Sequence, residues 1–180
     1  MSFPSIHLSL GLIILIIAIL GNFVLAVFVF INNSKSSTNR IFSLLSLVMI
    51  SWLVVAYISF LPSLLESSLI WIRLSVVFAA PMASLLFLLS HTVPNSKLLL
   101  KPRTLYLIIF LTIMIMVLNI SPLTFSTLEI VNNSPNPVPS LGIIPFALFS
   151  IVFSSLSIYT LITKFAKATG TTKEQLRFAM

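Results

Sequence analysis

The chain has 180 residues, of which 58% are hydrophobic and 7% are charged, and its mean hydropathy is +1.17. A soluble domain typically has about 25% charged residues, so this composition excludes a soluble globular protein. Ten Lys and Arg against three Asp and Glu give a net charge of +7. The charge is spread over short segments between apolar runs, which suits anionic lipid headgroups better than nucleic acid. The absence of cysteine excludes disulfides and thiolate metal sites.

Five apolar runs follow one another along the chain, with lengths close to that of a membrane-spanning helix. They cover residues 8–31, 41–61, 69–89, 105–120 and 141–162. The runs are apolar on every face, so they predict helices rather than the alternating strands of a membrane β-barrel. The connection 121–140 is too rich in Pro and Asn to be a helix along its whole length. The sequence therefore predicts an all-helical, polytopic membrane bundle with five complete spans.

Basic residues are found in alternate gaps between the runs. Nine of the ten Lys and Arg lie in the first gap, in the third gap and after the fifth run, and Arg73 is the exception. Basic residues in short loops are retained on the cytoplasmic side of a membrane. This distribution predicts a multi-pass protein of the cell membrane with its N-terminus outside and residue 180 in the cytoplasm.

The last residues have the pattern of a helix start. Gly170 is well placed to end the fifth helix. Thr171 and Glu174 fit a capping box, and apolar residues follow. We expect a sixth helix to begin within residues 172–180 and to continue beyond them. The alternative is a short amphipathic tail that lies on the membrane surface.

Several stretches resemble the N-terminal seven-transmembrane region of bacterial sensor histidine kinases, which is also found ahead of diguanylate cyclases. They are residues 21–59, the span from Arg73 to the HTVPNSK of 91–97, and residues 159–180 with the motif Gln175-Leu176-Arg177. The resemblance implies that residues 1–180 are a membrane sensor region holding the first five of seven spans. It also implies signalling in a two-component system, from ligand or membrane state to a cytoplasmic kinase or cyclase domain that this chain lacks. The alternative is a stand-alone small membrane subunit or transporter component.

The membrane spans carry no obvious chemistry. No run has Asp, Glu, Lys or Arg in its central part. A charge at the bilayer centre costs about 2.5–3.5 kcal/mol and usually marks a functional site, so this pattern disfavours a pump or an intramembrane protease. We predict no catalytic residue, no cofactor and no metal site. His7 and His91 are expected on opposite faces of the membrane and therefore cannot share a metal.

Three residues are candidate ligand contacts: Arg73, Asn22 and Tyr57. Arg73, at the predicted outer end of the third span, can pair with Glu66 or hold an anionic ligand through its planar guanidinium. Asn22 lies near the middle of the first span and is expected to bond a neighbouring helix, with ligand contact as the alternative. Tyr57 lies in the second span, where an aromatic residue near the interface commonly anchors a helix.

Pro81 lies inside the third run and removes one backbone hydrogen bond from the helix. It is a candidate hinge for signalling, and a static kink that aids packing is the alternative. Ser150 and Ser154 place two small residues on one face of the fifth run, where they suit close helix packing. The expected partners are anionic lipid headgroups at the basic loops, an unidentified small ligand and a second copy of the chain, with no nucleic acid.

Overall fold

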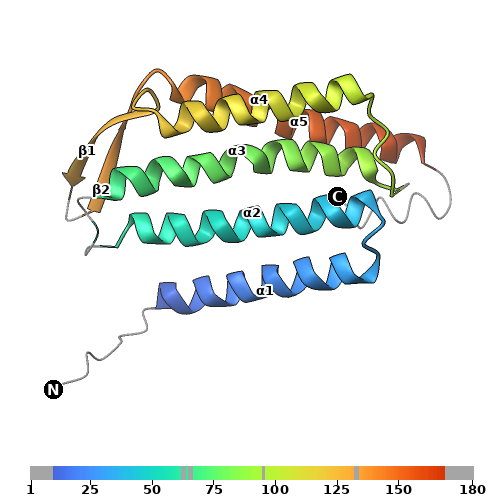
Figure 1. Ribbon diagram of the computed structural model, residues 1–180, viewed down its shortest axis with the longest axis horizontal. Helices are drawn as coiled ribbons and strands as arrows, with labels where there is room; N and C mark the ends of the chain where they lie inside the picture. Colours follow the sequence, from blue (N-terminus) through green and yellow to red (C-terminus); the bar gives the residue numbers. More distant parts are fainter. Residues whose placement is uncertain (1–9, 62–63, 65–66, 95, 132–133, 169–180) are drawn as a thin grey trace.

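The computed structural model describes residues 10–61, 64, 67–94, 96–131 and 134–168. Within these residues the chain forms five helices and one two-stranded hairpin (Figure 1). The elements are α1 (Leu10–Asn32), α2 (Ser37–Ser59), α3 (Ser68–Thr92), α4 (Pro102–Ile120), β1 (Phe125–Val131), β2 (Ser134–Pro139) and α5 (Ile143–Lys167). All five helices are long and apolar enough to cross a membrane. The predicted fold class, an all-helical membrane bundle with five spans, is confirmed.

Each helix covers one of the predicted apolar runs, but the ends differ by a few residues. α2 begins at Ser37 rather than at residue 41, because the Ser36 hydroxyl accepts a hydrogen bond from the Asn39 N–H at 3.4 Å and caps the helix. α5 continues to Lys167 rather than ending at residue 162. The predicted start of a sixth helix at 172–180 lies outside the described residues.

α3 is the central helix of the bundle. It contacts α2, α4, α5 and the hairpin, whereas α1 packs mainly on α2. In Figure 1, α1 to α4 lie side by side in chain order and α5 crosses α4 and α3. The buried hydrophobic cluster joins α2, α3, α4 and α5 and comprises Leu45, Ala80, Ala83, Leu85, Leu88, Ile108, Ile115, Phe149 and Phe153.

Helix α5 packs through one stripe of its surface. The buried residues are Phe149, Phe153 and Ser157, which follow one another at a spacing of one helical turn. The Ser157 hydroxyl donates to the Leu86 carbonyl of α3 at 3.1 Å. The predicted small-residue pair, Ser150 and Ser154, is only half-buried. The packed stripe therefore lies beside the predicted one and uses aromatic side chains together with one serine.

The connection between α4 and α5 folds into a β-hairpin that the sequence did not predict. β1 and β2 pair antiparallel, with Leu128 opposite Pro137 and Glu129 opposite Asn136. β1 packs on α3, so the hairpin covers one end of the bundle (Figure 1).

Candidate functional site

Arg73 lies in the second turn of α3 and reaches the hairpin. Its Nε and Nη2 both donate to the carbonyl oxygen of Phe125, at 3.2 and 2.5 Å. Phe125 is buried and is the first residue of β1. A guanidinium carries five N–H donors, so this contact leaves donors for a further acceptor. Glu66, the partner predicted as an alternative to a ligand, lies outside the described residues.

A small cavity of about 250 Å³ borders Arg73. Its lining combines the Arg73 side chain with the apolar side chains of Ile70, Leu74 and Ile120, from α3 and the last residue of α4. A planar cation beside apolar walls suits a small anionic or amphiphilic ligand, which it can hold through two parallel hydrogen bonds.

Next to Arg73, two polar side chains are fully buried at the hairpin end of the bundle. Asn119 and Thr124 are each 0% exposed. The Asn119 amide donates to the Val76 carbonyl of α3 at 3.4 Å, and the Thr124 hydroxyl lies 3.4 Å from Asn119 Oδ1 and 3.1 Å from the Leu118 carbonyl. We call Arg73, Asn119 and Thr124 the hairpin-end cluster. It joins α3, α4 and the start of the hairpin.

The hairpin also closes tightly onto the start of α5. The Gly142 N–H donates to the Leu123 carbonyl at 2.7 Å, and the Ser140 N–H donates to the Thr124 carbonyl at 2.9 Å. A Cβ added at Gly142 would lie 2.6 Å from the Leu123 carbonyl oxygen, so only glycine fits here without a backbone shift. The hairpin is thereby tied to α5 as well as to α3.

At the opposite end of α3, side chains from two other helices satisfy its final carbonyls. Lys164 of α5 donates from Nζ to the carbonyls of Ser90 and Val93, at 2.8 and 2.6 Å. The Thr38 hydroxyl of α2 lies 3.5 Å from the Thr92 carbonyl. The last carbonyls of a helix lack partners within the helix, and a lysine there also complements the helix dipole. We call Lys164, Thr38 and Thr92 the loop-end cluster.

The three predicted ligand residues do not form one site. Asn22 bonds within its own helix, from Nδ2 to the Ala18 carbonyl at 2.9 Å, so the predicted bond to a neighbouring helix is wrong. The reason is that α1 packs mainly on α2 and buries only Ala26. Tyr57 is half-buried in the last turn of α2, and among the described residues no hydrogen bond joins it to Arg73 or Asn22.

Pro81 lies inside α3, which continues as a helix on both sides of it (Figure 1). The Ser84 hydroxyl donates to the Pro81 carbonyl at 3.0 Å. Both residues border an apolar cavity of about 460 Å³ between α2, α3 and α4, which Thr112 of α4 also lines. Bending of α3 at Pro81 would change the shape of this cavity, and the hinge at Pro81 stays a prediction.

His91 makes local contacts in the last turn of α3. Its Nδ1 lies 3.0 Å from the Phe87 carbonyl, and the two rings lie 4.4 Å apart between centroids. Within the part of the chain that the structure describes, no group of three His, Cys, Asp or Glu residues could hold a metal ion. His7 lies outside that part.

Sequence reasoning identified only Arg73 among the six residues of the two clusters and missed the other five, including Thr38 and Thr92. Asn119 and Thr124 flank the end of α4, where polar residues are ordinarily solvated at the membrane surface. Lys164 was grouped with the basic tail that sets the topology. The sequence position of Asn119, Thr124 and Lys164 could have indicated these contacts. A polar residue in or next to the last turn of an apolar span can reach the carbonyls of a neighbouring helix.

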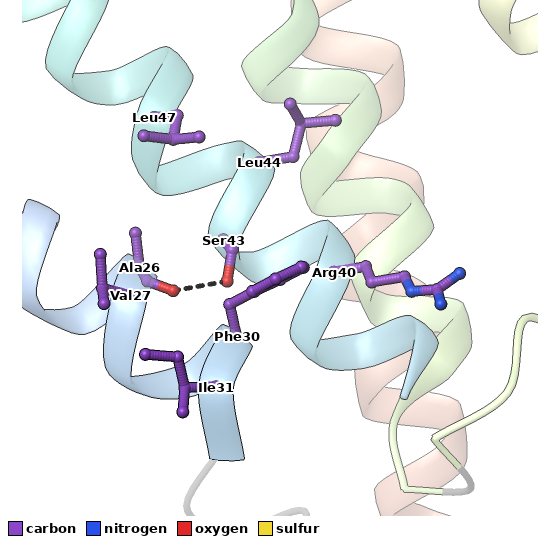
Figure 2. Close-up of a pocket in the computed structure, with 8 residues that line it drawn as sticks. All are labelled: Ala26, Val27, Phe30, Ile31, Arg40, Ser43, Leu44 and Leu47. Carbon is purple, nitrogen blue, oxygen red and sulfur yellow. Dashed lines mark hydrogen bonds between the residues drawn. The ribbon is translucent and has the colours of Figure 1, made fainter. Parts of the chain in front are cut away.

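A groove between α1 and α2 has a volume of about 520 Å³ (Figure 2). Its floor is narrow because the Ser43 hydroxyl of α2 donates to the Ala26 carbonyl of α1 at 2.8 Å. The remaining lining residues are Val27, Phe30, Ile31, Arg40, Leu44 and Leu47.

The helices and their packing define the class of this protein as a multi-pass helical membrane protein. A family model described as the N-terminal 7TM region of histidine kinase matches residues 14–180. The chain therefore belongs to this family of membrane sensor input regions, and the predicted resemblance is confirmed. A search of curated proteins and a search of solved structures each returned no match.

Proposed function

We propose that this region detects a ligand or a state of the membrane and relays it to a cytoplasmic output domain of the kinase or cyclase type, encoded beyond residue 180. The observation that carries the proposal is the family match, which extends over residues 14–180. The family description names seven spans, and five candidate spans lie in the described residues. Two further spans before the output domain would complete the region.

The proposed mechanism is a shift between two packings of the bundle, of which the ligand stabilises one. α3 supports such a relay because it is held at one end by the hairpin-end cluster and at the other by the loop-end cluster. An anionic ligand in the small cavity would bind the Arg73 guanidinium and compete with the Phe125 carbonyl. Release of the hairpin would change the position of α3 relative to α5.

The proposed orientation places the hairpin outside the cell and the loop-end cluster at the cytoplasmic face. It rests on the positive-inside distribution of Lys and Arg. Reporter fusions test it: alkaline phosphatase should be active after residue 131, and a fluorescent protein should fold after residue 168. The reverse pattern of reporter activity would overturn the orientation and, with it, the external ligand site.

Reading the gene beyond codon 180 tests the relay to an output domain. We expect an open frame with two more apolar runs followed by a kinase or cyclase domain. A stop codon directly after codon 180 would contradict the proposal and favour a stand-alone membrane subunit.

Arg73→Ala tests the ligand contact in the protein produced from the complete gene. We expect normal membrane insertion and a response to small carboxylates or phosphates weakened by about tenfold or more, because a hydrogen bond to a charged group is worth about 1.5–3 kcal/mol. The measurement is output activity against ligand concentration. Arg73→Lys should restore part of the response, and Arg103→Ala, at an exposed position at the start of α4, is the control. A response that Arg73→Ala leaves unchanged would rule out this contact.

A further inference from the structure

The groove between α1 and α2 combines apolar walls with a cation at one end. Arg40, in the first turns of α2, is exposed, and its Nε donates to the Ser34 carbonyl at 2.6 Å. Figure 2 shows its guanidinium pointing away from the Ser43 hydroxyl at the groove floor. Lys35 is exposed in the turn between the two helices. Glu129, the one acidic residue in the described part of the chain, lies in β1 at the other end of the bundle (Figure 1).

The groove extends through about two thirds of the acyl depth of one leaflet of a bilayer. From Arg40 to Leu47 the helix rises about 10 Å, at about 1.5 Å per residue. One leaflet contributes about half of a hydrocarbon core about 30 Å thick. The turn between α1 and α2 is the polar connection between two membrane spans, so Arg40 lies near the headgroups and Leu47 lies within the acyl region.

The groove is closed at its floor and open to lipid at its mouth. Two hydrogen bonds hold α1 against α2, from the Ser43 hydroxyl to the Ala26 carbonyl and from the Asn39 amide to the Val29 carbonyl, both at 2.8 Å. Larger side chains, including Phe30 and Leu47, form the rims and are 46% and 47% exposed. The volume of about 520 Å³ lies within the range of about 300–1,000 Å³ that is usual for small-molecule sites.

We propose that this groove binds one acyl chain of an anionic phospholipid, with the phosphate held by Arg40 and Lys35. The cation placed at headgroup level selects the occupant, because an arginine binds phosphate through two parallel N–H donors. An apolar helix from another protein would fill the walls but would bring no anionic group to the Arg40 donors that the Ser34 carbonyl does not occupy. The site is independent of the proposed sensing function.

Native mass spectrometry of the purified chain in detergent tests the site, with phosphatidylglycerol and phosphatidylcholine added in equal amounts. We expect the unaltered protein to retain phosphatidylglycerol several-fold over phosphatidylcholine. Arg40→Gln should reduce this preference to near one, and Arg40→Lys should keep part of it. Leu47→Trp should fill the groove and displace the lipid without a change in charge. The matched control is Arg103→Gln, which removes an exposed cation outside the groove and should leave the preference intact.

Three results would overturn the site. Equal retention of both lipids by the unaltered protein would show that the groove does not select an anionic headgroup. An equal loss of preference in Arg40→Gln and Arg103→Gln would indicate attraction to the general positive charge of that face. If Leu47→Trp dissociates a dimer and leaves lipid retention unchanged, the groove is a contact between two copies of the chain. Helix content measured by circular dichroism identifies a variant that fails to fold. If Arg40→Gln fails to fold, the lipid retention of the unaltered protein and of Leu47→Trp still tests the site.

Discussion

Helices α1 and α3 are both uninterrupted spans, yet they occupy opposite situations in the bundle. In the most apolar window of α1, 6% of the residues are buried, against 39% in α3. α1 has no Ser or Thr between its ends and buries only Ala26, whereas α3 buries a series of small residues, which includes Ala80, Ala83 and Ser84. Lipid is as apolar as leucine, so a strongly apolar helix gains little by leaving it. In this protein hydrophobicity locates the spans, and small residues locate the helix that others pack against.

The largest expected effect tests whether α3 is packed as tightly as its small residues indicate. Ala80 is 0% exposed, so Ala80→Leu should destabilise the fold by about 1–3 kcal/mol through overpacking. In α1, nothing lies within 4 Å of a Cβ added at Gly21, and Gly21→Leu should cause no loss. The measurement is unfolding in detergent by titration with a denaturing surfactant, followed by circular dichroism. Equal effects of the two substitutions would remove the contrast between the helices.

An intermediate effect is expected where α5 caps α3. Lys164→Met removes the donors to the Ser90 and Val93 carbonyls and should cost about 0.5–2 kcal/mol, the usual worth of a side-chain cap. Lys167→Met, in the same turn of α5 but exposed, is the matched control and should have no effect. The thermal unfolding midpoint in micelles is the readout. A loss of stability as large in the control would mean that net charge, and not the cap, is responsible.

The smallest effect compares two asparagines of the spans, of which one bonds another helix and the other bonds its own helix. Asn119 bonds α3 from α4, so Asn119→Leu should cost about 0.6 kcal/mol, the average for an interhelical hydrogen bond in a membrane. Asn22 bonds its own helix, and Asn22→Leu should leave stability unchanged within error. Both changes are measured in the same unfolding titration. A clear loss in Asn22→Leu would show that α1 has a packing partner outside the described contacts.

The spans could be predicted from the sequence because lipid offers no hydrogen bonds to the backbone, and long apolar runs must therefore be helical. Their packing could not be predicted in the same way. The stripe Phe149, Phe153 and Ser157 was not distinguished from the neighbouring pair Ser150 and Ser154, since both have helical spacing and apolar surroundings. Which stripe is buried depends on the position of α3, which the residue pattern of α5 alone does not give.

The candidate site was predicted only in part. Arg73 stood out because it breaks the charge pattern, and it does border a cavity. Its contact with Phe125 joins positions far apart in the chain and depends on a hairpin that was not predicted from the sequence. Prolines are tolerated in strands that lie at the edge of a sheet, and in a two-stranded sheet both strands are edges. The hydrogen bonds of Lys164 to the end of α3 likewise depend on the packing of α5 beside α3, which the sequence pattern does not give.

The prolines of β2 also limit what the hairpin can recruit. Pro135 and Pro137 stand two residues apart and pair with Ile130 and Leu128 of β1. Residues two apart in a strand direct their backbone nitrogens to the same side, and a proline nitrogen carries no hydrogen. A third strand that approached β2 would find these donors missing, so an extended peptide cannot readily lengthen the sheet there. The β2 edge of the hairpin thus resists edge-to-edge pairing with a neighbouring molecule.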